Sequence, residues 1–103
     1  MTRTVTARPG LRFGYTYKLF GRRAGAKVSL RFVGLFPARG LRNPQTGRTT
    51  HKDQVTAVNA MGERYVNLYT FEHDWEIVPG VWTFQIWYQG RKLAEQSFTV
   101  VKP

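Results

Sequence analysis

The densest cluster of side chains that could perform acid–base chemistry or bind a metal is the run Glu72-His73-Asp74-Trp75-Glu76. General acid–base catalysis needs paired carboxylates, or a histidine that a second group orients. Adjacent residues of a strand point to opposite sides, so His73 and Asp74 cannot pair unless a turn separates them. As metal ligands, the run offers hard oxygens and one imidazole, with no second cluster at a recognisable spacing. We interpret these acids as partners for basic residues elsewhere in the chain.

Other signatures of catalysis are missing from the sequence. There is no cysteine, and therefore no thiolate nucleophile, thiolate metal site or disulfide. There is also no glycine-rich phosphate loop and no Gly-x-Ser-x-Gly motif. We predict a non-enzymatic protein with no catalytic residue, no metal and no cofactor.

Charge is the most unusual bulk property of the chain. The net charge is +10; residues 1–52 contain twelve Lys or Arg and no acid, whereas residues 53–103 contain four Lys or Arg and six acids. Such asymmetry indicates an anionic partner, whether nucleic acid, an anionic membrane or glycan surface, or an acidic protein. The alternative is a soluble domain whose charges simply lie on outward faces. The candidate anion-binding residues are Arg22, Arg23, Arg39, Arg42 and Arg48.

The clearest structural pattern lies within residues 75–101, which contain all three tryptophans. In residues 81–89, Trp82 and every second residue after it are apolar or aromatic, which is the period of a strand with one face on a core. Gln89-Gly90-Arg91 predicts a turn, and residues 92–101 return as the partner strand. The apolar positions of this partner change parity, which predicts a β-bulge near residues 95–97.

Further strands are predicted at residues 3–7, 11–20, 26–36, 54–60 and 64–71, separated by turn formers. The first is expected at a sheet edge. The strand at 64–71 is apolar on both sides, which leaves its register open. Residues 37–53 show no periodicity and predict a long loop, which in so small a domain is either functional or mobile.

About seven short strands without an amphipathic helix predict an all-β fold, an antiparallel immunoglobulin-like sandwich of fibronectin or macroglobulin type without a disulfide. A five-stranded oligonucleotide-binding barrel is the alternative, because basic strands with aromatic residues suit it. At 103 residues the chain is expected to form one domain, residues 1–103. The expected core comprises Phe13, Tyr15, Leu30, Phe32, Trp82, Phe84, Ile86 and Phe98.

The second half of the chain also contains a series of longer motifs. They are Trp75-Glu76-Ile77-Val78-Pro79-Gly80, Trp82-Thr83-Phe84-Gln85-Ile86-Trp87-Tyr88, Gly90-Arg91-Lys92-Leu93-Ala94-Glu95 and Phe98-Thr99-Val100, with Asn43-Pro44, Thr46-Gly47 and Arg12-Phe13-Gly14 before them. Together they resemble a bacterial family, domain-of-unknown-function family 3859. The resemblance covers most of the chain and implies a β-sandwich, but no activity and no catalytic residues.

Of two classes of function, we favour a protein-interaction or structural module over a nucleic-acid binder. Nucleic-acid binders place stacking aromatics beside arginines on one exposed face, whereas the aromatics of residues 11–19 lie opposite Arg12 and Lys18. A protein-binding face is predicted instead around an outward-facing tryptophan, where a partner protein or a second copy of the chain would dock. The alternative is that the loop at 37–53 covers this face. The predicted partner-binding residues are Trp87, Val33, Leu35 and Arg31.

The compartment is predicted from two negative observations. No apolar run approaches the ~18 residues that span a bilayer, and the N-terminal residues lack the apolar segment of a signal peptide. We expect a cytoplasmic protein without a membrane span, or the mature domain of an exported protein.

The charge pattern predicts that polyanion binding is weak, independent of base sequence and centred on the five candidate arginines. Because such contacts release counterions, the affinity for a labelled oligonucleotide should fall steeply between about 50 and about 200 mM salt. Titrations at these two concentrations measure the effect. Tight, sequence-selective binding that survives the higher concentration would contradict this prediction.

Overall fold

The structure, a computed structural model, describes residues 2–20 and 25–102. These residues form strands and one short 3₁₀ helix, η1 (Asp74–Glu76). The prediction of an all-β fold is confirmed, and the predicted strands correspond to all the observed ones except the two-residue strands β4 and β5. In chain order the strands are β1 (Thr2–Thr6), β2 (Arg12–Lys18), β3 (Lys27–Leu35), β4 (Leu41–Arg42), β5 (Thr49–Thr50), β6 (Lys52–Ala60), β7 (Arg64–Thr70), β8 (Gly80–Tyr88) and β9 (Arg91–Val101).

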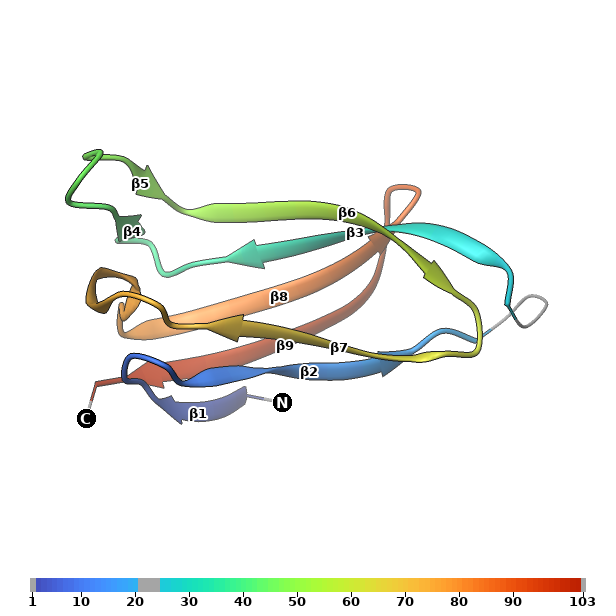
Figure 1. The fold of residues 1–103 in the computed structure, drawn as a ribbon, viewed down its shortest axis with the longest axis horizontal. Coiled ribbons are helices and arrows are strands. Elements are labelled where there is room, and N and C mark those ends of the chain that lie inside the picture. Colours follow the sequence, from blue (N-terminus) through green and yellow to red (C-terminus); the bar gives the residue numbers. More distant parts are fainter. Residues whose placement is uncertain (1, 21–24, 103) are drawn as a thin grey trace.

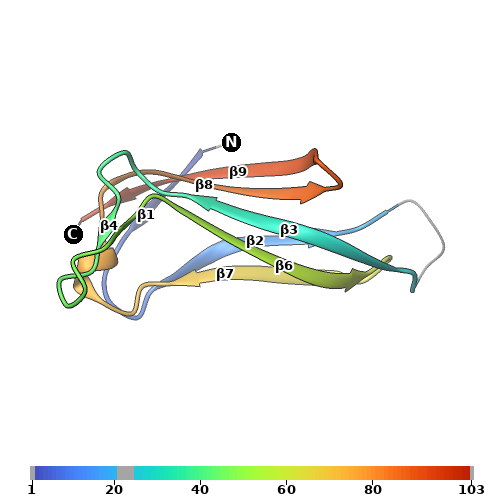
Figure 2. The ribbon, with the colours of Figure 1, turned by 90° about the horizontal axis from the view of Figure 1, so that it is seen from above.

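The strands form two layers of unequal width (Figures 1 and 2). The wide layer is a five-stranded sheet in the order β1-β9-β8-β3-β6, and the narrow layer is the β2–β7 pair. Neighbouring strands are antiparallel except β1, which runs parallel to β9. The prediction of an antiparallel sandwich is therefore wrong at this one edge. The reason is that β1 leads through Pro9-Gly10 into the opposite layer instead of turning back on its neighbour.

The β8–β9 hairpin has the tight turn that the sequence predicts. Gln89 and Gly90 both have positive φ angles, 47° and 79°, as a type I′ turn requires. The β-bulge, however, lies elsewhere than predicted. Ile86 pairs with Ala94 and Trp87 pairs with Lys92, so the extra residue is residue 93 rather than one of residues 95–97. The side chain of Leu93 is 46% exposed, so its place in the alternation of β9 does not indicate that it faces the core.

Residues 37–53 contain a small hairpin, which corrects the prediction of a loop without structure. β4 and β5 pair antiparallel, and the tip is closed by the Gly47 N–H, which donates to the Asn43 carbonyl. Leu41 is 4% exposed and packs in the core. The hairpin lies at one end of the sandwich (Figure 1), and Leu41 joins it to the core.

The core is centred on Trp82 of β8, which is fully buried. Its indole N–H donates to the Val78 carbonyl at 3.0 Å. Its ring lies in an aromatic cluster that both layers contribute to, at centroid distances of 4.9–5.8 Å from the rings of Phe36, Tyr69, Phe71 and Phe13.

The predicted core is confirmed in part. Its buried members are Phe13, Leu30, Trp82, Ile86 and Phe98. The other three, Tyr15, Phe32 and Phe84, are only partly buried. They face inward as predicted, but they line a groove that the narrow layer does not cover.

This distribution of the core predicts unequal costs of truncation. Trp82→Ala should lower the free energy of unfolding by about 3–5 kcal/mol, because it opens a large cavity and leaves the Val78 carbonyl unpaired. Phe32→Ala, at the partly exposed groove, should cost clearly less. Urea unfolding followed by circular dichroism measures both variants, and equal losses would contradict the expected difference.

Candidate binding groove

The narrow layer leaves part of the wide layer uncovered. Tyr69 of β7 contacts Trp82 of β8, and Tyr17 of β2, beside Tyr65, contacts Phe32 of β3. Among the described residues no strand of the narrow layer lies beyond β7, so the inward face of β6 has no strand opposite it. The sandwich is therefore open on one side.

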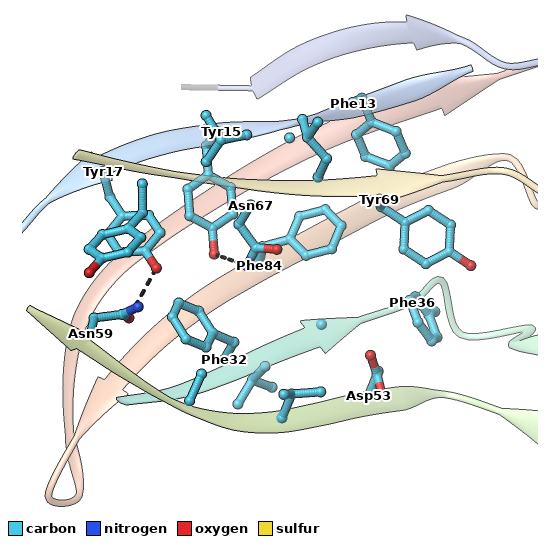
Figure 3. A pocket seen from close by; sticks show the side chains of 18 residues that line it. Phe13, Tyr15, Tyr17, Phe32, Phe36, Asp53, Asn59, Asn67, Tyr69 and Phe84 are labelled. Atoms are coloured by element: carbon cyan, nitrogen blue, oxygen red, sulfur yellow. Dashed lines mark hydrogen bonds between the residues drawn. The ribbon is translucent and has the colours of Figure 1, made fainter. Parts of the chain in front are cut away.

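The open side forms a groove of about 360 Å³ between β6 and β7 (Figure 3). Its surface is mainly aromatic: Phe32 and Phe84 come from the wide layer, and Tyr15 and Tyr17 come from the narrow layer. Val55 of β6 also faces the groove and is 54% exposed, which is a large exposed fraction for an inward-facing aliphatic residue. The groove thus exposes apolar surface that a complete sandwich would bury.

Two pairs of polar side chains in the groove are hydrogen-bonded to each other. The Tyr17 hydroxyl donates to Asn59 Oδ1 at 3.1 Å, and Asn67 Nδ2 donates to the Tyr15 hydroxyl at 3.0 Å (Figure 3). Burial raises the pKa of Tyr15 and of Tyr17 above the usual value, so both hydroxyls are neutral at physiological pH. The described residues that line the groove include one carboxylate and no Lys, Arg, His, Ser or Thr. Such a lining suits binding of apolar groups rather than bond-breaking chemistry.

The acidic run at residues 72–76 has a structural role. Glu76 accepts hydrogen bonds from the backbone N–H groups of Glu72 and His73 at 2.7 and 2.8 Å, and from the Tyr69 hydroxyl at 3.0 Å. The only salt bridge among the described residues joins Lys92 and Glu95. For the described part of the chain, the prediction that these acids pair with basic residues is therefore wrong. The Glu76 carboxylate instead bonds to the turn that leads into β8.

The histidine of this run is also engaged locally, since the His73 ring stacks on Trp75 with centroids 5.6 Å apart. Within residues 2–20 and 25–102, no group of three or more His, Cys, Asp or Glu side chains could hold a metal ion. No helix in the same residues is long and apolar enough to cross a membrane.

The predicted partner-binding residues lie together on the outer face of the wide layer. Arg31 and Trp87 are cross-strand partners, and the Arg31 guanidinium lies 5.5 Å from the centroid of the Trp87 ring. The Trp87 indole N–H donates to Gln85 at 2.9 Å. Val33 is only 5% exposed, and Leu35 is partly buried. The apolar patch is therefore smaller than predicted, and its role in docking stays a prediction.

The alternative prediction, that residues 37–53 cover this outer face, is wrong. The β4–β5 hairpin lies at the end of the sandwich opposite the β8–β9 turn, whereas Trp87 lies next to that turn (Figure 1).

The predicted anion-binding arginines fall into two groups. Arg22 and Arg23 lie outside the described residues. Arg39, Arg42 and Arg48 are exposed on the β4–β5 hairpin and the turn before it, and none forms a salt bridge with a described acid. These three cations are free to meet an anion, and polyanion binding stays a prediction.

The alternation of apolar and polar residues does not predict the groove by itself. It indicates which way each side chain of a strand points, but not whether another strand lies opposite that side chain. One signal is nevertheless present in the sequence of β7. Asn67 shares its inward parity with Tyr65 and Tyr69, while Val66 and Leu68 face outward and are 59% and 51% exposed. This settles the register that the sequence leaves open. A polar residue between two inward tyrosines indicates an inner face that water reaches.

The Tyr69–Glu76 contact predicts a loss of stability at alkaline pH. Burial, and then the charge of Glu76, raise the folded-state pKa of Tyr69 well above its usual 10.0. The unfolded chain therefore loses this proton first, so this contribution to the free energy of unfolding is complete below about pH 10 and falls as the pH rises further. Tyr69→Phe should make the alkaline decline shallower and cost about 1 kcal/mol at neutral pH.

Urea unfolding at a series of pH values from neutral to strongly alkaline measures this decline in both proteins. Tyr15 and Tyr17 still contribute in the variant, so part of the decline should remain. An unchanged alkaline slope in Tyr69→Phe would contradict the assignment.

Known proteins support the fold and identify the family. An immunoglobulin-like protein from Pseudomonas aeruginosa, solved by crystallography, is similar to this chain with a TM-score of 0.80 and 31% sequence identity, over 95% of this chain and 77% of that one. This likeness confirms the immunoglobulin-like sandwich over the oligonucleotide-binding barrel. No curated protein is significantly similar to the chain. The model of the family described as domain of unknown function DUF3859 matches residues 1–100, and the chain therefore belongs to this family.

Proposed function

We propose that the chain is a non-enzymatic binding module that takes up a polypeptide segment of a partner protein in the groove between β6 and β7. The observation that carries this proposal is the unequal width of the layers. A five-stranded sheet faces a two-stranded one, which leaves aromatic side chains open to solvent beside the unpaired edges of β6 and β7 in the described chain. Open apolar concavities of this kind commonly mark binding sites.

The chemistry of the lining fits the side chains and backbone of a polypeptide. Phe32, Phe84 and Val55 provide apolar contact area, and aromatic residues are enriched where proteins meet. The amides of Asn59 and Asn67 add a few hydrogen-bonding groups that can fix orientation. A nucleophile beside a base, which covalent catalysis requires, is missing from the described lining residues.

The groove supports this function better than the outer face does. In the predicted patch on the outer face the polar end of Trp87 is bonded to Gln85, and Val33 is buried, so little free apolar surface remains beside Trp87. In the groove, Val55 is more than half exposed. The groove is also a concave site, which gives a bound segment contacts on more than one side.

The test uses two matched tryptophan variants on β6. Ala57 lines the groove, whereas Thr56, the next residue back, faces outward opposite Arg31. The probe is a peptide selected on this protein from a displayed library of random segments long enough to span β7. Ala57→Trp fills the groove and should weaken peptide binding at least about tenfold, or 1.4 kcal/mol. Thr56→Trp should leave it unchanged.

Fluorescence anisotropy of the labelled peptide measures binding, and circular dichroism with urea unfolding shows whether each variant is folded. Loss of binding in Thr56→Trp but not in Ala57→Trp would place the site on the outer face beside Trp87 and overturn the proposal.

A further inference from the structure

β7 has one free edge, and the hydrogen bonds of the ladder determine which residues face it. The Phe71 N–H donates to the Leu11 carbonyl, immediately beyond the end of the β2–β7 ladder. In an antiparallel ladder every second pair of residues is hydrogen-bonded. Counting back from Phe71, the backbone groups of Tyr69, Asn67 and Tyr65 therefore bond to β2.

A close approach between the two strands agrees with this assignment. The carbonyl of Asn67 faces Gly14 of β2, where any Cβ would clash with it, so this carbonyl points toward β2. The N–H and C=O groups of the alternate residues, Val66 and Leu68, therefore point away from β2. They form a row of unpaired donors and acceptors along the free edge of β7, which is a template for another strand.

A strand added to this edge would lie above the uncovered part of the wide layer. It would be about 4.8 Å from β7 and about 10 Å from the strands below it. Its inward side chains would meet Phe32, Val55 and Ala57, which line the groove. Because β7 has seven residues, a segment of similar length can pair along it, and every second side chain would enter the groove.

Charge decides between the occupants. A second copy of the chain would bring two charges of +10 together, which opposes self-pairing. Lys18 and Arg64 are cross-strand partners at one end of the narrow layer, and neither forms a salt bridge with a described acid. At the other end of the groove, Lys52 is followed by Asp53, whose carboxylate lines the groove. An occupant with a carboxylate near the end that meets Lys18 and Arg64 complements these two cations.

We infer, on the basis of the proposed function of the groove, that the partner segment binds as an added β-strand with an acidic residue at the end that meets Lys18 and Arg64. It pairs with the backbone of Val66 and Leu68, and its alternate apolar side chains fill the groove over Val55. The narrow layer then has three strands, and its edge is no longer exposed. In this mode of recognition the backbone hydrogen bonds supply affinity and the groove supplies specificity.

An N-methyl scan of the selected peptide tests the pairing. Each methyl group removes one backbone donor without changing a side chain. Binding should weaken about tenfold at every second position, where the N–H faces β7, and change little at the positions between. This pattern does not depend on whether any protein variant folds.

Amide hydrogen exchange on the protein provides the second measurement. The amides of Val66 and Leu68 should exchange more slowly when the peptide is bound, whereas that of Asn67, already bonded to β2, should not change. Replacement of the peptide's acidic residues by their amides should weaken binding severalfold at low salt, and added salt should remove the difference.

The outcomes separate this inference from the proposed function. If Ala57→Trp weakens peptide binding but the N-methyl scan shows no alternation, strand addition is overturned and the groove remains the binding site. If Ala57→Trp does not affect peptide binding, both strand addition and the proposed function of the groove are overturned. A dimer in sedimentation experiments with slowed exchange at Val66 and Leu68 would assign the edge to a second copy. Equal binding of the acidic and amide peptides would overturn the assignment of an acidic end.

Discussion

The burial of Trp82 is the interaction on which the rest of the structure depends. An indole ring without solvent exposure needs an acceptor for its N–H, and the Val78 carbonyl provides it. That bond fixes the turn by which the chain enters β8. The ring also contacts Phe13 of β2 and Tyr69 of β7, so the narrow layer is held over one half of the wide layer. The well-packed core lies where these contacts converge.

The groove is the consequence of holding two strands over five. A two-stranded layer cannot cover the whole inner face, and β6 is the strand left open. The side chains in this region pair their polar groups, Tyr17 with Asn59 and Asn67 with Tyr15, so none of these four is left without a partner. Because the polar groups of these four side chains are hydrogen-bonded, the groove is stable in water even though its aromatic surface is open, and the sandwich does not collapse. The groove also leaves apolar area that is buried only when something binds.

The exposed arginines of the β4–β5 hairpin are not part of the lining of the groove. The described lining of the groove carries no cation, whereas the exposed arginines Arg39, Arg42 and Arg48 belong to the β4–β5 hairpin and the turn before it. For the proposed binding module, long-range attraction by the cations would mainly raise the association rate, and apolar contact in the groove would set the dissociation rate. A strongly basic surface is therefore compatible with recognition of an acidic protein segment and does not by itself indicate nucleic acid.

The sequence by itself determined where most strands run and which side chains face inward, because alternation is a local property of an extended chain. It placed Trp82, Phe98 and Phe13 in the core and the β8–β9 turn at Gln89-Gly90, where both residues adopt positive φ. Family membership also followed from local motifs. Only the tertiary structure decided which strands pair, since pairing joins residues far apart in the chain.

For this reason the sequence missed the parallel β1–β9 edge, the bulge at residue 93 and the hairpin at 37–53. It missed the groove for the same reason. Phe32 and Val55 point inward by parity, yet their exposure depends on whether a strand lies opposite them. β6 pairs with β3 in the wide layer and not with β7, so within residues 2–20 and 25–102 no strand lies opposite these two side chains.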